Sequence, residues 1–229
     1  FRSCTSLTSV SIPNSVTSLG GRVFMGCTSL TSVSLPASLV TINSYMFNGC
    51  GALNSVTIPT TVESILEGAF HSCASLASLS LPSSLTSIGN QAFEKCTSLA
   101  SVALPSSLRS VGYGAFIGCS SLGTITIPEG VTSLGGAAFQ SCTALRTVSL
   151  PSTVSVVSDY LFYHATALEE VSFSSSITSV GERSFQFCSA LRSVDLSSAN
   201  QLATVGARAF YGCSSLATVA LPASVQSIA

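Results

Sequence analysis

The sequence predicts a β-rich solenoid in which one short structural unit is stacked about ten times along a single axis. Three features predict it: phenylalanine returns every 23 residues, cysteine follows most of these phenylalanines by three residues, and proline keeps a fixed place in the period. A fixed period of this length is the signature of repeat architectures. The periodic phenylalanines are Phe1, Phe24, Phe47, Phe70, Phe93, Phe116, Phe139, Phe162 and Phe185, with Phe210 following after 25 residues.

The first predicted element of each repeat is a short strand. If each repeat is numbered from its phenylalanine as position 1, apolar residues at positions 10 and 12 alternate with hydroxyl residues at positions 9 and 11, as in residues 32–35 (SVSL). Alternation with period two is typical of a half-buried strand. Proline at position 13 ends the strand, because it lacks the N–H that a ladder needs. The prolines at this position are Pro13, Pro36, Pro59, Pro82, Pro105, Pro128, Pro151 and Pro222.

A second, weaker strand and a turn complete the repeat. Residues 131–134 (VTSL) represent positions 16 to 19, which are too short for a helix before the glycine that often follows at position 20. From that glycine to the cysteine at position 4, apolar residues share one face at helical spacing. We therefore expect a second strand on the opposite face and a single α or 3₁₀ turn in each repeat.

The complete motif resembles a known family. Residues 28–36 (TSLTSVSLP) and 85–96 (LTSIGNQAFEKC) are similar to the two halves of the BspA-like leucine-rich repeat, and the resemblance covers essentially all of residues 1–229. It implies a curved leucine-rich-repeat arc with parallel strands. It also implies a surface or secreted protein of the kind found in bacteria and parasitic protists, with a role in adhesion to matrix proteins and cells. The motif residues belong to the scaffold, so the resemblance implies no catalytic site.

Composition limits the possible partners. Charged residues are 7% of the chain and the net charge is −1, against about 25% charged residues in typical soluble domains. This balance argues against nucleic acid, which needs a basic stripe, and no apolar stretch reaches the roughly 20 residues of a membrane span. We expect residues 1–229 to form a single solenoid that belongs to a longer array, since neither end carries the polar cap of a terminal repeat.

The nine cysteines admit several interpretations. A disulfide ladder fits the spacing of neighbouring strands but not the required twist, and Ala165 interrupts the column. Zinc ligands are normally two to four residues apart within a pair, not 23. A reactive thiol needs a nearby base or cation. The favoured interpretation is a buried thiol that serves as a small apolar filler, and it leaves the redox compartment open.

The sequence predicts no enzyme, no cofactor and no metal site. His71 beside Ser72, and His164 near Asp159, are the nearest approaches to a nucleophile with a base. Neither has a known catalytic signature, and serine is abundant enough for accidental proximity. A phosphate-binding glycine loop is also missing from the sequence.

The outward columns give the candidate protein-binding site. Repeats one to six present hydroxyl residues at positions 9 and 11 except at Ala103, whereas repeats seven to nine carry charges at positions 8, 9 or 11. The same repeats lose scaffold residues, with Ser174 and Ser197 in place of proline and two extra residues within 197–201. Binding surfaces are often found where the consensus fails. The alternative is a solvated ion ladder of little energetic value. The candidate residues are Arg146, Glu169, Glu170, Arg192 and Asp195.

The leading functional prediction is a non-enzymatic binding or adhesion module at the cell surface or outside the cell. Its partner is expected to be a matrix or cell-surface protein. An alternative is a structural subunit, with this array packed against neighbouring subunits of an assembly or filament. A remote alternative is an ice-binding surface, because two hydroxyl columns repeated about every 4.8 Å form a flat lattice. Tyrosines near the turns either anchor a partner or lie over the core: Tyr45, Tyr113, Tyr160, Tyr163 and Tyr211.

Overall fold

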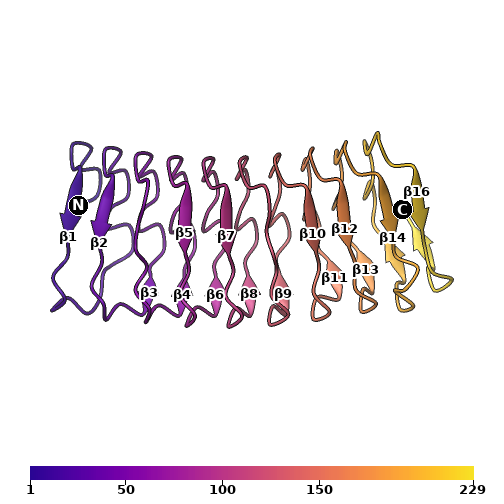
Figure 1. Cartoon of the computed structure of the whole chain (residues 1–229), viewed down its shortest axis with the longest axis horizontal. Coiled ribbons are helices and arrows are strands. Elements are labelled where there is room, and N and C mark those ends of the chain that lie inside the picture. Colours follow the sequence, from indigo (N-terminus) through magenta and orange to yellow (C-terminus); the bar gives the residue numbers. More distant parts are fainter.

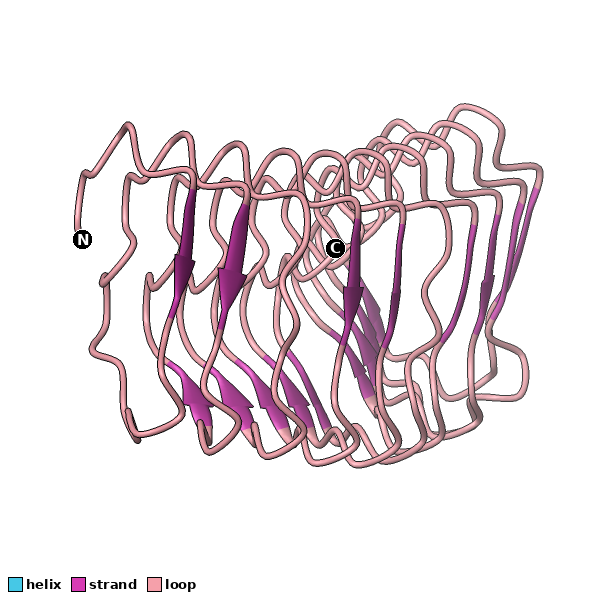
Figure 2. Ribbon diagram, turned by 60° about the vertical axis from the view of Figure 1, so that its left-hand side comes forward, coloured by secondary structure: helices cyan, strands magenta, loops and turns pink.

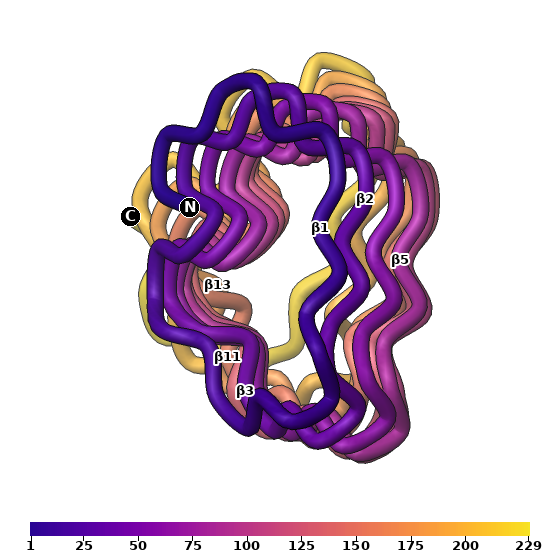
Figure 3. Tube along the Cα trace, turned by 90° about the vertical axis from the view of Figure 1, so that its left-hand side faces the viewer, coloured from indigo at the N-terminus to yellow at the C-terminus, as the bar shows by residue number.

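The computed structural model describes residues 1–229 and shows a parallel β-solenoid. Figure 1 shows its turns lying side by side from the N-terminus to the C-terminus, with one row of strands above a second row. The end view in Figure 3 shows that each turn is a flattened loop whose strands lie on different sides of a shared interior. One continuous core of 61 buried residues runs along the stack. The expected solenoid architecture is confirmed.

The first row of strands contains positions 9 to 11 of the repeat, as predicted. All pairing is parallel and in register, with Ser9 opposite Ser32 in repeats one and two. The middle residue points inward and the flanking residues are exposed, for example in the strand around Val33. These strands are β1 (Ser9–Ser11), β2 (Ser32–Ser34), β5 (Ser78–Ser80), β7 (Ser101–Ala103), β10 (Thr147–Ser149), β12 (Glu170–Ser172), β14 (Ser193–Asp195) and β16 (Thr218–Ala220).

The second row consists of strands of two residues each. They form one sheet in the order β3-β4-β6-β8-β9 and another in the order β11-β13-β15-β17. The two extra residues of repeat nine leave this register intact, since Ser179 pairs with Thr204 across the longer step. These strands are β3 (Thr41–Ile42), β4 (Ser64–Ile65), β6 (Ser87–Ile88), β8 (Ser110–Val111), β9 (Ser133–Leu134), β11 (Val156–Val157), β13 (Ser179–Val180), β15 (Thr204–Val205) and β17 (Ser227–Ile228).

The expected helical turn is wrong, because the chain contains no helix (Figure 2). Between the second strand and the cysteine, N–H groups alternate between two kinds of acceptor. Those of Gln91, Phe93 and Lys95 donate to the next repeat at 2.7–2.8 Å, while the residues between them and Cys96 close isolated turns by donating three residues back. Half of the N–H groups therefore join neighbouring repeats instead of forming a helix. No helix of the length and hydropathy needed to cross a membrane is present.

Backbone conformation explains why this segment is not helical. Every residue with positive φ lies either two residues before a periodic phenylalanine or two residues after it, as Gln91 (53°) and Lys95 (58°) do around Phe93. A left-handed residue breaks a right-handed helix, and such conformations are costly for side chains branched at Cβ. None of these positions holds valine, isoleucine or threonine. The two positions thus select against β-branched residues.

The phenylalanine column forms the centre of the core. Neighbouring rings stack with centroids 5.2–5.8 Å apart and interplanar angles of 4–20°. The rings from Phe24 to Phe185 are fully buried. Offset stacking at this spacing is favourable beyond the burial of area alone. The 23-residue period therefore builds one continuous aromatic stack.

The cysteines are free thiols, and seven of the nine are buried. Each periodic thiol from Cys27 onward donates a hydrogen bond to the phenylalanine carbonyl of the preceding repeat, at 2.9–3.2 Å. Their role is therefore more than apolar filling. Burial raises the pKa of Cys96 and Cys142 to about 12, because a thiolate is poorly solvated there. These thiols are protonated at neutral pH, which makes them weak nucleophiles.

Candidate functional site

The predicted site residues lie within or directly before the first-row strands β10, β12 and β14 of repeats seven to nine. Three of them form a ladder of alternating charge: Arg146 Nη1 lies 2.8 Å from Glu169 Oε1, and Arg192 Nη2 lies 3.1 Å from Glu169 Oε2. The arginine side chains are 69% and 73% exposed, and that of Glu169 is 30% exposed. Glu169 is therefore clamped between two cations from neighbouring repeats. The stacking predicted from the sequence is confirmed, while its role in binding stays a prediction.

The other two predicted residues, Glu170 and Asp195, line a surface opening between repeats eight and nine. The opening has a volume of about 280 Å³. Asp195 Oδ1 accepts hydrogen bonds from the Ser197 N–H at 3.0 Å and from the Ser197 hydroxyl at 2.6 Å. These bonds lower the pKa of Asp195, with the hydroxyl contributing most, and keep the carboxylate charged.

The opening lies where the first row of strands is interrupted. In the pairs of repeats 1–2, 7–8 and 9–10, the N–H at position 12 donates to a carbonyl of the next repeat at 2.9–3.0 Å. The Phe173 N–H has no such acceptor, and the Asp195 carbonyl has no donor. No hydrogen-bonded pairing joins β12 to β14. Backbone groups are therefore available at the opening itself.

Two further openings occur at the same place in other repeats. The opening between repeats two and three has a volume of about 440 Å³, and the one between repeats five and six about 290 Å³. In each case the position-12 residue of the earlier repeat is part of the lining, namely Leu35, Leu104 or Phe173. Neither of the other two openings has a charged residue in its lining. Of these three openings, the one at repeats eight and nine is therefore the one with acidic residues in its lining.

Sequence reasoning missed the opening and several of its lining residues. Phe173, Ser193 and Ser198 face it beside the predicted carboxylates. A signal was present, because Phe173 replaces the usual leucine and Ser174 replaces the usual proline in the same repeat. The interrupted pairing itself could not be predicted, since it depends on backbone hydrogen bonds between repeats.

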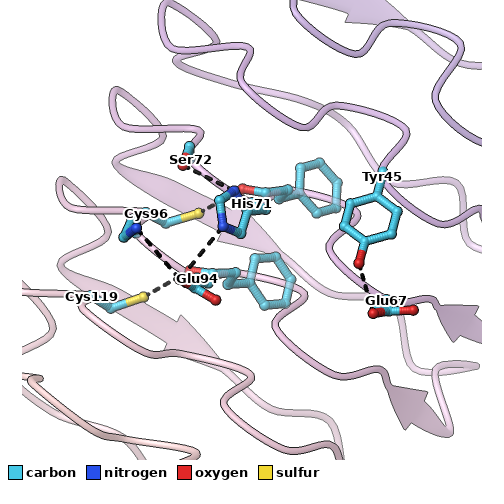
Figure 4. A network of polar contacts seen from close by, with 10 residues as sticks. Tyr45, Glu67, His71, Ser72, Glu94, Cys96 and Cys119 are labelled. Atoms are coloured by element: carbon cyan, nitrogen blue, oxygen red, sulfur yellow. Dashed lines mark hydrogen bonds and ion pairs between the residues drawn. The ribbon is translucent and has the colours of Figure 1, made fainter.

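The histidines lie away from this surface, on the turns. Ser72 Oγ lies 3.0 Å from His71 Nδ1, and His71 Nε2 lies 3.5 Å from Glu94 Oε1 (Figure 4). Lys95 Nζ also lies 3.7 Å from Glu94 Oε1. The pairing of His71 with Ser72 is confirmed, but Glu94 was missed because it comes from the next repeat. No surface opening is lined by any of these four residues.

The second histidine arrangement is wrong. His164 is not hydrogen-bonded to Asp159, whose carboxylate accepts a bond from the Glu182 N–H at 2.7 Å. Instead, the His164 ring packs near Tyr163 and edge-on against Phe187. No group of three or more histidine, cysteine, aspartate or glutamate side chains is placed to hold a metal ion.

The tyrosines divide between the two roles that the sequence left open. Tyr113 is 52% exposed and Tyr211 is 60% exposed, so both stand out from the turns. Tyr45, Tyr160 and Tyr163 are half-buried. Tyr45 donates a hydrogen bond to Glu67 at 2.7 Å (Figure 4). The Arg22 guanidinium lies over the Tyr45 ring, so this tyrosine is held within the array.

Comparison with known proteins agrees with this geometry. The chain resembles crystal structures of a leucine-rich repeat protein from Bacteroides ovatus (26% identity, TM-score 0.57, covering 100% of this chain and 76% of that one) and of a leucine-rich cell surface protein from Faecalibacterium prausnitzii (26%, 0.60, covering 94% and 79%). It also resembles a leucine-rich repeat protein of T. pallidum (28%, 0.56, covering 80% and 77%). No curated protein sequence matches it.

The family is shown by a match over the whole chain. The sequence pattern of the BspA type leucine-rich repeat region (6 copies) matches residues 1–123 and again residues 110–229. The two matches overlap and together include every repeat. The chain therefore belongs to the family of BspA-type leucine-rich repeat proteins.

Proposed function

We propose that this chain is a non-enzymatic protein-binding module of a cell-surface or extracellular protein, and that its partner contacts the first row of strands at repeats seven to nine. The observation that carries the proposal is the charged ladder of Arg146, Glu169 and Arg192 beside an acidic opening. Elsewhere on this surface the outward residues are mostly serine and threonine. Charges gathered on one part of a nearly neutral surface favour the orientation and the selection of a partner.

The family and one structural relative support the location. A relative with 26% identity over 94% of this chain is a cell surface protein of Faecalibacterium prausnitzii. Stacked repeats provide a rigid, extended surface, which is how repeat proteins commonly bind other proteins. The thiols suit such a setting as well, because burial removes the thiolate form that oxidants attack.

The three openings argue against an ice-binding lattice. Such a lattice needs evenly spaced hydroxyl groups over many repeats. Pairing between the first-row segments is absent between repeats two and three, three and four, and eight and nine. Only the single bridges Ser101 to Thr124 and Thr124 to Thr147 join repeats five, six and seven. The strand pairing that would keep the hydroxyl columns evenly spaced is therefore interrupted at several places.

Charge reversal tests the proposed surface. The double variant Arg146→Glu/Arg192→Glu would surround Glu169 with like charges, and binding to intact cells and to a panel of extracellular-matrix proteins should fall by about tenfold or more. Arg22→Glu/Arg208→Glu makes the same change in net charge on the turns and serves as the control. Equal binding of the two variants would contradict the proposed surface. Self-association of the wild-type array in solution, without binding to cells or matrix, would favour the structural-subunit alternative.

A further inference from the structure

The opening between repeats eight and nine contains several unused hydrogen-bond acceptors, among them two carboxylates. The Glu170 carboxylate is exposed and makes no hydrogen bond or ion pair with the rest of the chain. Asp195 uses only Oδ1 for its bonds to Ser197, so Oδ2 is free. The Asp195 carbonyl also has no donor. Because β12 and β14 are not paired, backbone N–H groups such as that of Phe173 are unpaired there as well, but no cationic side chain of this chain contacts either carboxylate.

The two carboxylates lie at different heights on neighbouring strands. Glu170 is directly opposite Ser193 in the repeat register, and Asp195 follows two residues later in β14. Neighbouring strands are about 4.8 Å apart and two residues span about 6.6 Å along a strand. The two carboxylates therefore lie on a diagonal across the opening, which has a volume of about 280 Å³.

The lining combines this acidic rim with an aromatic surface. Phe173 is half-buried, and its ring is fixed edge-on against Phe185 at 6.0 Å. The openings at repeats two and three and at repeats five and six have Leu35 and Leu104 at the equivalent position. An aromatic ring offers a face for a flat cation, which a leucine does not.

Neighbouring cations do not neutralise the opening. Arg146 and Arg192 are the nearest basic residues in the sequence columns, and both are engaged by Glu169 at 2.8 and 3.1 Å. The two cations share this one carboxylate, so the ladder keeps one positive charge beside the two negative charges of Glu170 and Asp195. Glu170 and Asp195 are left without a basic partner from this chain.

We propose that this opening binds the guanidinium group of an arginine side chain of the partner protein. The inference rests on the proposed function and names the chemistry that the partner presents. Guanidinium carries five N–H donors in one plane and no acceptor, which complements two carboxylates and a free carbonyl. Its flat face and aliphatic stem match the Phe173 ring. A lysine ammonium offers a point charge without the planar fork, so it fits this diagonal pair less well.

The test uses three peptides that differ in one side chain. The probe is acetyl-Gly-Ser-Arg-Ser-Gly-amide, and the comparison peptides carry lysine or citrulline in place of arginine. Binding is followed from the amide shifts of Phe173 and Asp195 in nuclear magnetic resonance titrations. The arginine peptide should bind about tenfold more tightly than the lysine peptide, and the neutral citrulline peptide should not saturate. Equal affinity for arginine and citrulline would overturn the proposal.

Variants of the protein separate the opening from general charge. Glu170→Gln/Asp195→Asn should weaken the arginine peptide by about tenfold or more. Glu63→Gln/Asp159→Asn removes the same number of charges elsewhere and should leave the affinity unchanged. Loss of binding in both double variants to the same degree would show a nonspecific charge effect and refute the site. If millimolar Ca²⁺ displaces the arginine peptide from the wild-type protein and binds more tightly than the peptide does, the carboxylates form a metal-ion site. That result would also refute the proposal.

A gain-of-function experiment uses the neutral opening of similar size. Ser101 and Thr126 occupy, in the opening at repeats five and six, the places that Glu170 and Asp195 occupy at repeats eight and nine. Adding Ser101→Glu/Thr126→Asp to the Glu170→Gln/Asp195→Asn protein should restore part of the binding, and adding Leu104→Phe should restore more. No recovery in the triple combination would contradict the assignment. If the arginine peptide does not bind, but charge reversal at Arg146 and Arg192 still abolishes partner binding, the guanidinium site is refuted and the proposed function stands.

Discussion

Replacement of Phe116 by alanine tests the stacked core, because this ring is fully buried in the middle of the column. Its centroid lies 5.2 Å from that of Phe93 and 5.7 Å from that of Phe139. Full burial of a phenylalanine is worth about 1.5–3 kcal/mol, and each aromatic pair adds about 0.5–1.5 kcal/mol. Together with the cavity, the loss in the free energy of unfolding should be about 3–5 kcal/mol.

Urea unfolding under reducing conditions measures this loss. Phe1→Ala is the matched control, because Phe1 is 57% exposed and stacks on one ring only, at 5.5 Å from Phe24. Its cost should be about 1 kcal/mol or less. Equal losses for Phe116→Ala and Phe1→Ala, with an unchanged dependence on urea, would refute the claim that the periodic rings form a packed column.

Three further predictions concern the thiols and the turns. At pH 8, a thiol reagent should modify exposed Cys4 rapidly and the buried cysteines only on unfolding, which a count of labelled thiols over time would show. Because burial raises the pKa of Cys96 from 9.0 to about 12, the unfolded chain loses this proton first, and the free energy of unfolding should fall as pH rises above 9. Cys96→Ala should make that slope shallower by about 1.4 kcal/mol per pH unit, and an unchanged slope in alkaline urea titrations would contradict it. Ala137 has a φ of 54°, so Ala137→Gly should raise the free energy of unfolding by about 0.5–1 kcal/mol and Ala137→Val should lower it by about 1–2 kcal/mol; thermal melts that rank the variants in the opposite order would refute the strain.

Much of the fold was predictable because each column of the repeat has one physical role. Alternation around Val33 predicts the first strand, and the period of the phenylalanines predicts the stack that the structure shows. The helical turn was wrong for an identifiable reason. Spacing alone does not reveal that Gln91 and Lys95 adopt positive φ, or that alternate N–H groups bond to the next repeat.

The thiol bonds show a similar limit. Burial of Cys96 follows from its place in the column, but its donation to the Phe70 carbonyl depends on how one repeat is offset from the next. Ala165, which replaces cysteine in repeat eight, leaves the Phe139 carbonyl with the Cys142 N–H as its single donor. The scaffold therefore tolerates loss of one such bond within the repeats of the candidate site.

The candidate site was predicted in part. Charges at Arg146, Glu169 and Arg192 have the same position in successive repeats, and in-register stacking brings them together as expected. The opening that contains Glu170 and Asp195 could not be derived in the same way. It lies where strand pairing between repeats eight and nine is missing, which no single residue type specifies.

The most direct test of the account compares partner binding by Arg146→Glu/Arg192→Glu with that by Arg22→Glu/Arg208→Glu, at equal thermal stability. If the first row of strands at repeats seven to nine is the binding surface, the first variant should lose about tenfold or more in affinity for cells or matrix proteins and the second should retain wild-type affinity. Wild-type affinity in both variants would contradict the account.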